Sequence, residues 1–199
     1  MNALEEISVV LVSFVLGSIP FGIIVAKVKG VDLKKVGSGN IGATNVLRSL
    51  GKWPAALTLC GDILKGTLAV ASARYLDVGS AWEGVAGISA ILGHNFSIFL
   101  GFKGGKGVAT SMGVLLFYSP FAAVLTLIIW LAVVVITRYS SMGALVSFGL
   151  LPLNIYFFDP DDRAKLFVAI LITVFIFLRH GDNIRRLTKG TERKIGQRA

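Results

Sequence analysis

Long apolar stretches, separated by short polar ones, dominate this chain of 199 residues. They lie at residues 7–26, 53–73, 82–100, 108–118, 120–136, 142–158 and 164–178. A helix needs roughly 20 apolar residues to cross the hydrocarbon core of a bilayer. Only 16% of the residues are charged, against about 25% in soluble domains. The pattern therefore predicts an all-α integral membrane protein with a single domain, residues 1–199.

The number of spans depends on the short run at residues 108–118. Fusing it with the run at 120–136 would give six spans and would place the basic C-terminal segment outside the cell. Lys and Arg concentrate in cytoplasmic loops, so an arrangement that keeps every basic segment on one side is favoured. We therefore expect seven transmembrane helices, with the N-terminus outside and the C-terminus in the cytoplasm.

The positive charge of the chain is unevenly distributed. The formal net charge is +9, which in a soluble protein would suggest a nucleic-acid partner. Most of the Lys and Arg residues, however, fall in the polar segments at residues 27–52, 103–106, 138 and 179–198. This distribution is typical of cytoplasmic loops, which also contact anionic lipid headgroups. We predict membrane lipids as partners, and no nucleic acid.

The most unusual polar segment is a glycine-rich turn within residues 93–113, GHNFSIFLGFKGGKGVATSMG. Glycines allow tight turns that bring backbone N–H groups close to a ligand, and the next helix N-terminus attracts anions. The segment is therefore either a phosphate or carboxylate site or a basic, tight helix connection. It is not a Walker A motif, because Leu100 stands where the first glycine should be. The candidate anion-binding residues are Lys103, Gly104, Gly105, Lys106 and Gly107.

A second polar, glycine-rich segment, GSGNIGATNVLR, spans residues 37–48. It contains a literal G-x-G-x-x-G sequence, but no strand or βαβ unit surrounds it, which excludes a dinucleotide-binding fingerprint. Its polar side chains could wrap around an anion, although a plain loop is an equal alternative for this segment alone. The candidate binding residues are Ser38, Gly39, Asn40, Thr44, Asn45 and Arg48.

Further polar residues follow two later runs, at Ser141 and in the tail RHGDNIRRLTKGTERKIG with His180 and Asn183. The two histidines, His94 and His180, have no acidic or cysteine ligands beside them in the sequence, so we predict no metal. The single cysteine, Cys60, excludes an internal disulfide.

Asp62 and Lys65 are ionisable residues inside the second apolar run, and their spacing of three residues places them on one helical face. Charges within a membrane are costly and usually face a partner or a cavity. The pair could form an ion pair that ties this helix to a neighbour, or it could belong to a site, and the sequence favours neither.

Three separated motifs, in this order, resemble those of the bacterial acyl-phosphate-dependent glycerol-3-phosphate acyltransferases, the PlsY family. The motifs are GSGNIGATN with Arg48, GHNFSIFLGFKGGKGVAT, and RHGDNI followed by GTE. GSIPFG at residues 17–22 and DILKG at 62–66 are also similar to this family. Gly181 departs from the pattern, because a larger and often basic residue is expected there.

The resemblance implies an enzyme that moves a fatty acyl group from acyl phosphate to the 1-hydroxyl of glycerol 3-phosphate, giving lysophosphatidic acid and phosphate. It also implies seven spans, no cofactor, an active site at the cytoplasmic side of the bacterial inner membrane, and contact with the soluble enzyme that makes acyl phosphate. On this basis Arg48, Lys103 and Lys106 would hold phosphates. Ser38, Ser141, His180 and Asn183 would orient the phosphates and the acceptor hydroxyl.

Two other classes of function remain open from the residues alone. A small helical protein with a cationic, glycine-rich site could be an anion transporter or a transporter subunit. A membrane scaffold that binds anionic lipid through its tail is also possible, but it leaves both glycine-rich segments unexplained.

Overall fold

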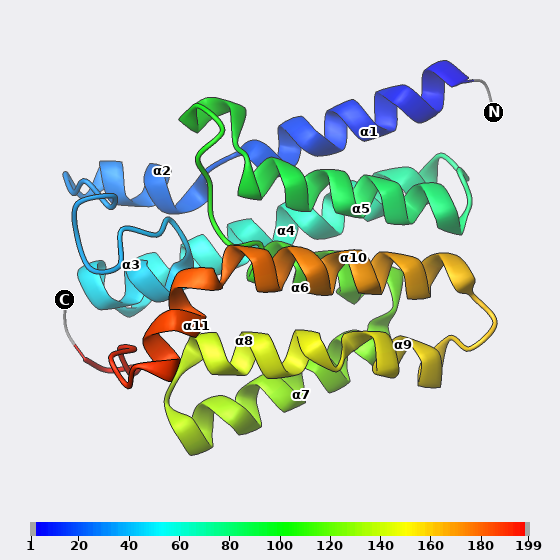
Figure 1. Cartoon of the computed structure of the whole chain (residues 1–199). Helices are drawn as coiled ribbons and strands as arrows, with labels where there is room; N and C mark the ends of the chain where they lie inside the picture. Colours follow the sequence, from blue (N-terminus) through cyan, green and yellow to red (C-terminus); the bar gives the residue numbers. More distant parts are fainter. Residues whose placement is uncertain (1–2, 198–199) are drawn as a thin grey trace.

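The computed structural model describes residues 3–197, and within them it contains α-helices, one 3₁₀-helix and no strand (Figure 1). This confirms the all-α prediction. The elements are α1 (Ala3–Ser18), α2 (Phe21–Val28), α3 (Ala43–Leu50), α4 (Lys52–Tyr75), α5 (Ser80–Asn95), the 3₁₀-helix η1 (Ile98–Leu100), α6 (Val108–Tyr118), α7 (Pro120–Thr137), α8 (Ser140–Gly149), α9 (Leu151–Phe158), α10 (Arg163–Arg179) and α11 (Gly181–Thr188).

Three helical segments of the described chain are long and apolar enough to cross a bilayer: Leu4–Val28, α4 and α7. Two bent pairs, α8 with α9 and α10 with α11, pass the same test if each pair is one span. The remaining candidates, α5 and α6, are 16 and 11 residues long, which is short for a span. Seven spans, and the orientation of the termini, therefore stay predictions.

Several predicted spans are interrupted in the structure. The first is broken between Ser18 and Phe21, next to Pro20, which lacks the backbone N–H that a continuous helix needs. The span predicted at 142–158 is bent by 42° between α8 and α9. The span predicted at 82–100 is wrong at its end, because its α-helix stops at Asn95.

The choice between fused and separate helices at residues 108–136 is settled by Ser119. Its backbone, with φ −147° and ψ 82°, is not helical, and Pro120 begins the next helix. The fourth and fifth apolar runs are therefore separate helices, as predicted.

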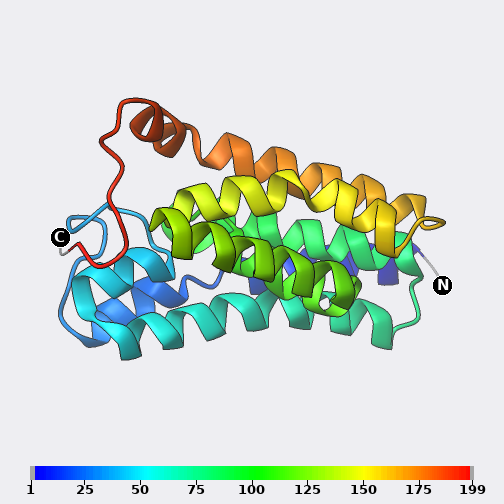
Figure 2. The ribbon, with the colours of Figure 1, turned by 90° about the horizontal axis from the view of Figure 1, so that it is seen from below.

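Two polar segments form helices that the apolar pattern did not predict. The segment at 37–48 contains the start of α3, and the basic tail contains α11. Both helices are amphipathic and lie at the end of the bundle opposite the N-terminus (Figures 1 and 2). The segment at 37–48, the C-terminal tail and the α7–α8 turn meet at this end, which we call the polar end.

Helices pack closely where glycine removes a side chain. A Cβ on Gly17 of α1 would lie 2.1 Å from the carbonyl oxygen of Ala90 in α5. A Cβ on Gly113 of α6 would lie 1.9 Å from the carbonyl oxygen of Ile63 in α4. Close backbone approach through small residues is the usual way for membrane helices to associate. It holds α5 against α1 and α6 against α4, close to the site described below.

We expect Gly113→Ala to destabilise the protein. The added methyl group would force α4 and α6 apart, and overpacking of this kind costs about 1–3 kcal/mol. Thermal unfolding in detergent should show a Tm several degrees below that of the wild type. The matched control is Gly149→Ala in α8, whose added Cβ would meet only the Phe177 ring, at 3.5 Å. Equal Tm values for the two variants would contradict the close packing of α4 against α6.

Candidate active site

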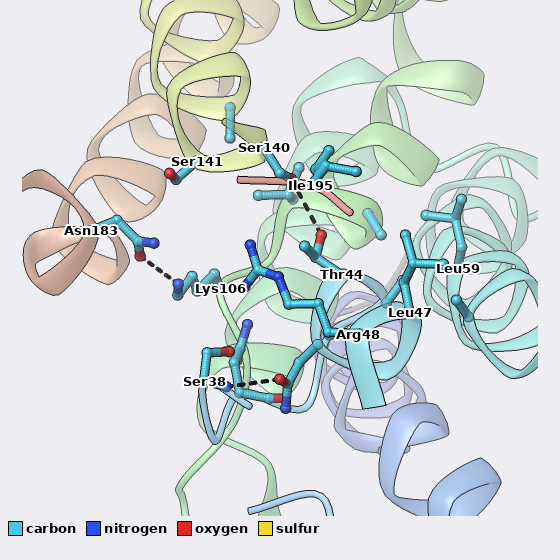
Figure 3. A pocket seen from close by; sticks show the side chains of 18 of the residues that line it. Ser38, Thr44, Leu47, Arg48, Leu59, Lys106, Ser140, Ser141, Asn183 and Ile195 are labelled. Atoms are coloured by element: carbon cyan, nitrogen blue, oxygen red, sulfur yellow. Dashed lines mark hydrogen bonds between the residues drawn. The ribbon is translucent and has the colours of Figure 1, made fainter. Parts of the chain in front are cut away.

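One cavity of about 590 Å³ opens among the segments that meet at the polar end (Figure 3). Its polar wall comes from residues 37–48, from the turn before α6, from the start of α8, and from α11 with the tail that follows it. Its apolar wall comes from α4, α6 and α7, with Leu59, Met112 and Leu127. Segments that are distant in the sequence thus share one polar and apolar cavity.

Asn45 shapes the loop that precedes α3. This side chain is buried; its Oδ1 accepts a hydrogen bond from the Ser38 N–H at 2.8 Å, and its Nδ2 donates to the Asn40 carbonyl at 2.8 Å. Nδ2 also lies within hydrogen-bond distance of the Leu33 and Val36 carbonyls, at 3.3 and 3.1 Å. Because buried amides need such partners, Asn45 holds the loop in the shape that brings Ser38 to the cavity.

The glycine-rich turn is held from two sides. The Gly105 N–H donates to the His94 carbonyl at 3.0 Å. From α10, Arg179 donates through Nε to the Gly105 carbonyl at 3.0 Å and through Nη2 to the Gly104 carbonyl at 3.1 Å. These bonds fix the backbone immediately before Lys106, whose side chain lines the cavity.

Glu192 connects three elements beside the cavity. Its Oε1 accepts hydrogen bonds from Ser141 Oγ and from Asn183 Nδ2, each at 2.7 Å, and its Oε2 accepts one from Arg186 Nε at 2.6 Å. Asn183 in turn accepts a hydrogen bond from the Lys106 ammonium through Oδ1 (Figure 3). Hydrogen bonds from Ser141, Arg186 and Asn183 outweigh burial and lower the pKa of Glu192, so this carboxylate stays charged.

Positive charge dominates the cavity. Arg48, Lys106 and Arg186 line it, with Glu192 as their nearest carboxylate partner. Burial, and then the neighbouring Arg186, lower the pKa of Lys106 to about 8. Burial also lowers the pKa of Arg48, whose buried Nε has no acceptor among residues 3–197. The unpaired donor and the partly desolvated ammonium are both suited to bind an anion.

His180 is buried in the cavity wall and is neutral near pH 7. Its Nδ1 lies 2.7 Å from the Ile176 carbonyl, which can only accept, so Nδ1 carries the proton and Nε2 is left as an acceptor. Burial, and then the charge of Lys106, lower the pKa of His180 to about 4. Within residues 3–197, no group of three or more His, Cys, Asp or Glu side chains is placed to hold a metal ion.

Comparisons with known proteins agree with one another. A family described as glycerol-3-phosphate acyltransferase matches residues 7–190. The chain belongs to this acyltransferase family. It is 44% identical to the glycerol-3-phosphate acyltransferase of Geobacter sulfurreducens, covering 96% of this chain and 98% of the relative. It is 49% identical to that of Agrobacterium fabrum, covering 94% and 91%.

Two solved structures of PlsY, an integral membrane glycerol 3-phosphate acyltransferase, are similar to this acyltransferase. The glycerol 3-phosphate form has a TM-score of 0.91 at 39% identity, and the lysophosphatidic acid form has 0.89 at 38%. Each comparison covers 96% of both chains. The chain is therefore a membrane-embedded enzyme that acylates glycerol 3-phosphate.

Most residues that the sequence nominated line the cavity of this acyltransferase. Those in the wall are Ser38, Asn40, Thr44, Asn45, Arg48, Lys106, Gly107, Ser141, His180 and Asn183. Those outside the wall are Gly39, Lys103, Gly104 and Gly105. The Lys103 side chain is exposed, whereas the carbonyl groups of Gly104 and Gly105 are held by Arg179 and fix the shape of the turn. A Cβ at Gly181 would meet nothing within 4 Å, so close packing does not require a glycine at this position.

Sequence reasoning missed several residues of the wall. The polar wall residues that the sequence did not nominate are His94, Ser140, Arg186, Thr191, Glu192 and Arg193. Asp62, which the sequence left open as an ion-pair or a site residue, also lines the cavity. Glu192 carried a signal, because it is the only glutamate in a strongly basic tail. The cavity contact of Asp62 and His94 depends on how α4 and α5 pack, which the sequence pattern does not show.

Proposed function

We propose that this acyltransferase uses acyl phosphate as its donor and the 1-hydroxyl of glycerol 3-phosphate as its acceptor, giving lysophosphatidic acid and phosphate. The observation that carries the proposal is a single cavity in which partly desolvated cations, one of them with an N–H that lacks an acceptor, lie beside an apolar wall. Such a cavity can take two phosphate groups and a fatty chain together. The two similar PlsY structures are a glycerol 3-phosphate form and a lysophosphatidic acid form, which supports the proposed acceptor and product.

The apolar wall suits the acyl chain of the donor. Figure 3 shows Leu47 and Leu59 on the side of Arg48 away from Asn183. In this arrangement the acyl chain of the donor lies against α4, α6 and α7, and its activated carbonyl group lies among the cations. The polar end would then face the cytoplasm, where glycerol 3-phosphate dissolves. We place the seven spans, the outside N-terminus and the inner-membrane location in the same proposal, because they keep the basic segments on one side.

In the proposed reaction, the acceptor oxygen bonds to the acyl carbon and the bond between that carbon and the phosphate oxygen breaks. Phosphate leaves with the electron pair of that bond. Arg48 and Lys106 offset the repulsion between the two phosphate groups and stabilise charge on the leaving phosphate. Ser141 and Asn183, both held by Glu192, would orient the acceptor. The donor is already activated, so positioning and charge stabilisation do most of the work.

The proton of the acceptor hydroxyl has two candidate destinations: the phosphate of the donor, or Nε2 of His180. A base is efficient when its pKa lies near the working pH, and the pKa of His180 is about 4. The proposal therefore assigns the proton to the donor phosphate, and it gives His180 an orienting role.

We expect His180→Asn to turn over slowly but to keep the acidic limb of the wild-type pH profile. If His180 were the base, kcat/KM would fall as pH drops through about 4, when the imidazole gains a proton, and the variant would lose that limb. The measurement is kcat/KM between pH 3.5 and 7 for both proteins. Residual activity of the variant that no longer falls as pH drops through about 4 would make His180 the base.

The donor can be tested directly with purified protein in detergent or lipid cubic phase. Acyl phosphate and glycerol 3-phosphate should release inorganic phosphate and form lysophosphatidic acid in equal amounts. Parallel reactions contain acyl-coenzyme A or acyl carrier protein as donor, and glycerol in place of glycerol 3-phosphate. Transfer from a thioester alone, with no phosphate release, would overturn the proposed donor. Contact with a soluble enzyme that makes acyl phosphate is part of the same proposal.

A further inference from the structure

A cluster of three ionisable side chains lies beneath the glycine-rich turn and has no part in the reaction as described. Lys65 Nζ lies 2.8 Å from Asp62 Oδ1, 2.8 Å from His94 Nδ1 and 2.9 Å from the Ile19 carbonyl. All three side chains are at least 96% buried. The ion pair that the sequence allowed between Asp62 and Lys65 is confirmed, and it ties α4 to α5 and to the break between α1 and α2.

The charge of Lys65 decides where the proton of His94 lies. An ammonium group has N–H donors and no acceptor, so Lys65, paired with Asp62, can contact His94 Nδ1 at 2.8 Å only as the donor. His94 Nδ1, which also lies 3.5 Å from Asp62 Oδ1, is then an acceptor, and the proton of the neutral ring sits on Nε2. A doubly protonated ring would carry that Nε2 proton as well. His94 consequently presents an N–H donor on its far side.

His94 is one of the residues that line the cavity, and its Nε2 atom lies against Gly105 of the glycine-rich turn. A Cβ on Gly105 would come within 2.1 Å of it, so the ring fits only because residue 105 has no side chain. His94 lines the same cavity as Lys106 and Gly107. Within residues 3–197, Nε2 of His94 makes no hydrogen bond, and it is not one of the fully buried polar atoms that lack a partner. Its N–H is therefore free to donate to an acceptor that enters the cavity.

We propose that His94 is a further substrate-binding residue, which donates its Nε2–H to a phosphate oxygen in the cavity. Asp62 and Lys65 are then positioning residues that hold the ring in this tautomer. Asp62 also lines the cavity, but Lys65 neutralises its charge, so it does not repel the ligand. The inference rests on the proposed function, because it places substrate phosphate beside Lys106.

Two substitutions separate this role from a purely structural one. His94→Gln can keep an N–H near the position of Nε2 while losing the acceptor for Lys65. His94→Asn can keep the acceptor for Lys65 while losing the donor to the cavity. We expect kcat/KM for glycerol 3-phosphate or for acyl phosphate to be at least fivefold higher in His94→Gln than in His94→Asn. The difference should come mainly from a lower KM in His94→Gln. A structural residue that only satisfies Lys65 would give the opposite order.

A second measurement uses the wild-type protein, so it does not depend on the folding of any variant. The chain contains two histidines, which allows ¹⁵N-histidine NMR of the protein in lipid with assignment by His180→Asn. We expect glycerol 3-phosphate or inorganic phosphate to shift the Nε2–H resonance of His94. No shift at saturating concentrations of both would overturn the inference, as would a neutral Nδ1–H tautomer.

The same assays distinguish this inference from the proposed function. Wild-type protein that releases no phosphate from acyl phosphate would contradict the proposed function. Active wild-type protein with an equally active His94→Asn variant would contradict the role of His94 alone.

The positioning role of Asp62 and Lys65 is tested by the double variant Asp62→Asn/Lys65→Met, which removes both charges together. This variant should retain the fold but lower kcat/KM, and a wild-type kcat/KM would exclude the positioning role.

Discussion

Replacing Lys106 with methionine is expected to lower kcat/KM by about 100-fold or more while leaving the Tm near that of the wild type. Methionine keeps much of the length of the side chain but removes the ammonium that lies in the cavity and donates to Asn183. Loss of one well-placed donor to developing charge typically raises the barrier by about 3 kcal/mol. Steady-state phosphate release measures the effect.

Lys103→Met is the matched control, because Lys103 is in the same turn but is exposed and outside the cavity wall. Its kcat/KM should stay close to the wild-type value. Equal losses in the two variants would mean that the turn contributes only general positive charge. Normal activity of Lys106→Met would remove the turn from the proposed mechanism.

The charge of Lys106 also sets the expected alkaline limit of the enzyme. Its pKa is lowered to about 8, so the ammonium of the free enzyme loses its proton as pH rises through that value, and phosphate binding weakens. The pH profile of kcat/KM should therefore fall above about pH 8. Lys106→Arg, which stays protonated, should retain some activity and lose this limb. An unchanged limb in the arginine variant would assign the limb to another group.

The second large effect is expected at Glu192, where alanine should lower kcat/KM by about 30-fold or more. Ser141, Asn183 and Arg186 would lose a common acceptor, and removing one partner of a hydrogen-bonded charge leaves the others unsatisfied. Because the site loses its arrangement, KM for glycerol 3-phosphate should rise while kcat falls. The Tm should also fall, because the carboxylate links α8, α11 and the tail.

Glu192→Gln tests how much of this effect is charge. The amide can still accept from Ser141 and Asn183 through Oε1, but it places an N–H against Arg186, so an intermediate loss is expected. Asp182→Asn is the control, because Asp182 is an exposed acid of α11, the helix that precedes Glu192 in the chain. A loss in Asp182→Asn as large as in Glu192→Ala would show that only net charge matters.

The apolar pattern predicted helices well where a segment is apolar along its whole length, because lipid contact and helix packing then both favour apolar residues. The helix at Val108–Tyr118 has the predicted bounds, and α7 ends within one residue of its prediction. The pattern failed at α3 and α11, whose polar faces hide them from a search for apolar runs. It also overextended α5, because the residues after Asn95 are apolar yet form a turn and a 3₁₀-helix.

The site was predictable in its parts but not in its detail. Motif chemistry brought Arg48, Lys106 and Asn183 onto one list, and all three line the cavity. It could not separate Lys103 from Lys106, because a glycine-rich turn has no periodicity that says which way each side chain points. It could not connect His94 to Lys65 either, since that contact depends on the packing of α4 against α5.

The central claim is that one cavity holds both phosphate-bearing substrates at the same time, so that acyl transfer is direct. Initial rates of phosphate release, measured while acyl phosphate and glycerol 3-phosphate are varied together, test this claim most directly. Direct transfer in a complex of both substrates predicts double-reciprocal lines that intersect. Parallel lines, the mark of a ping-pong reaction through a covalent acyl-enzyme, would contradict it.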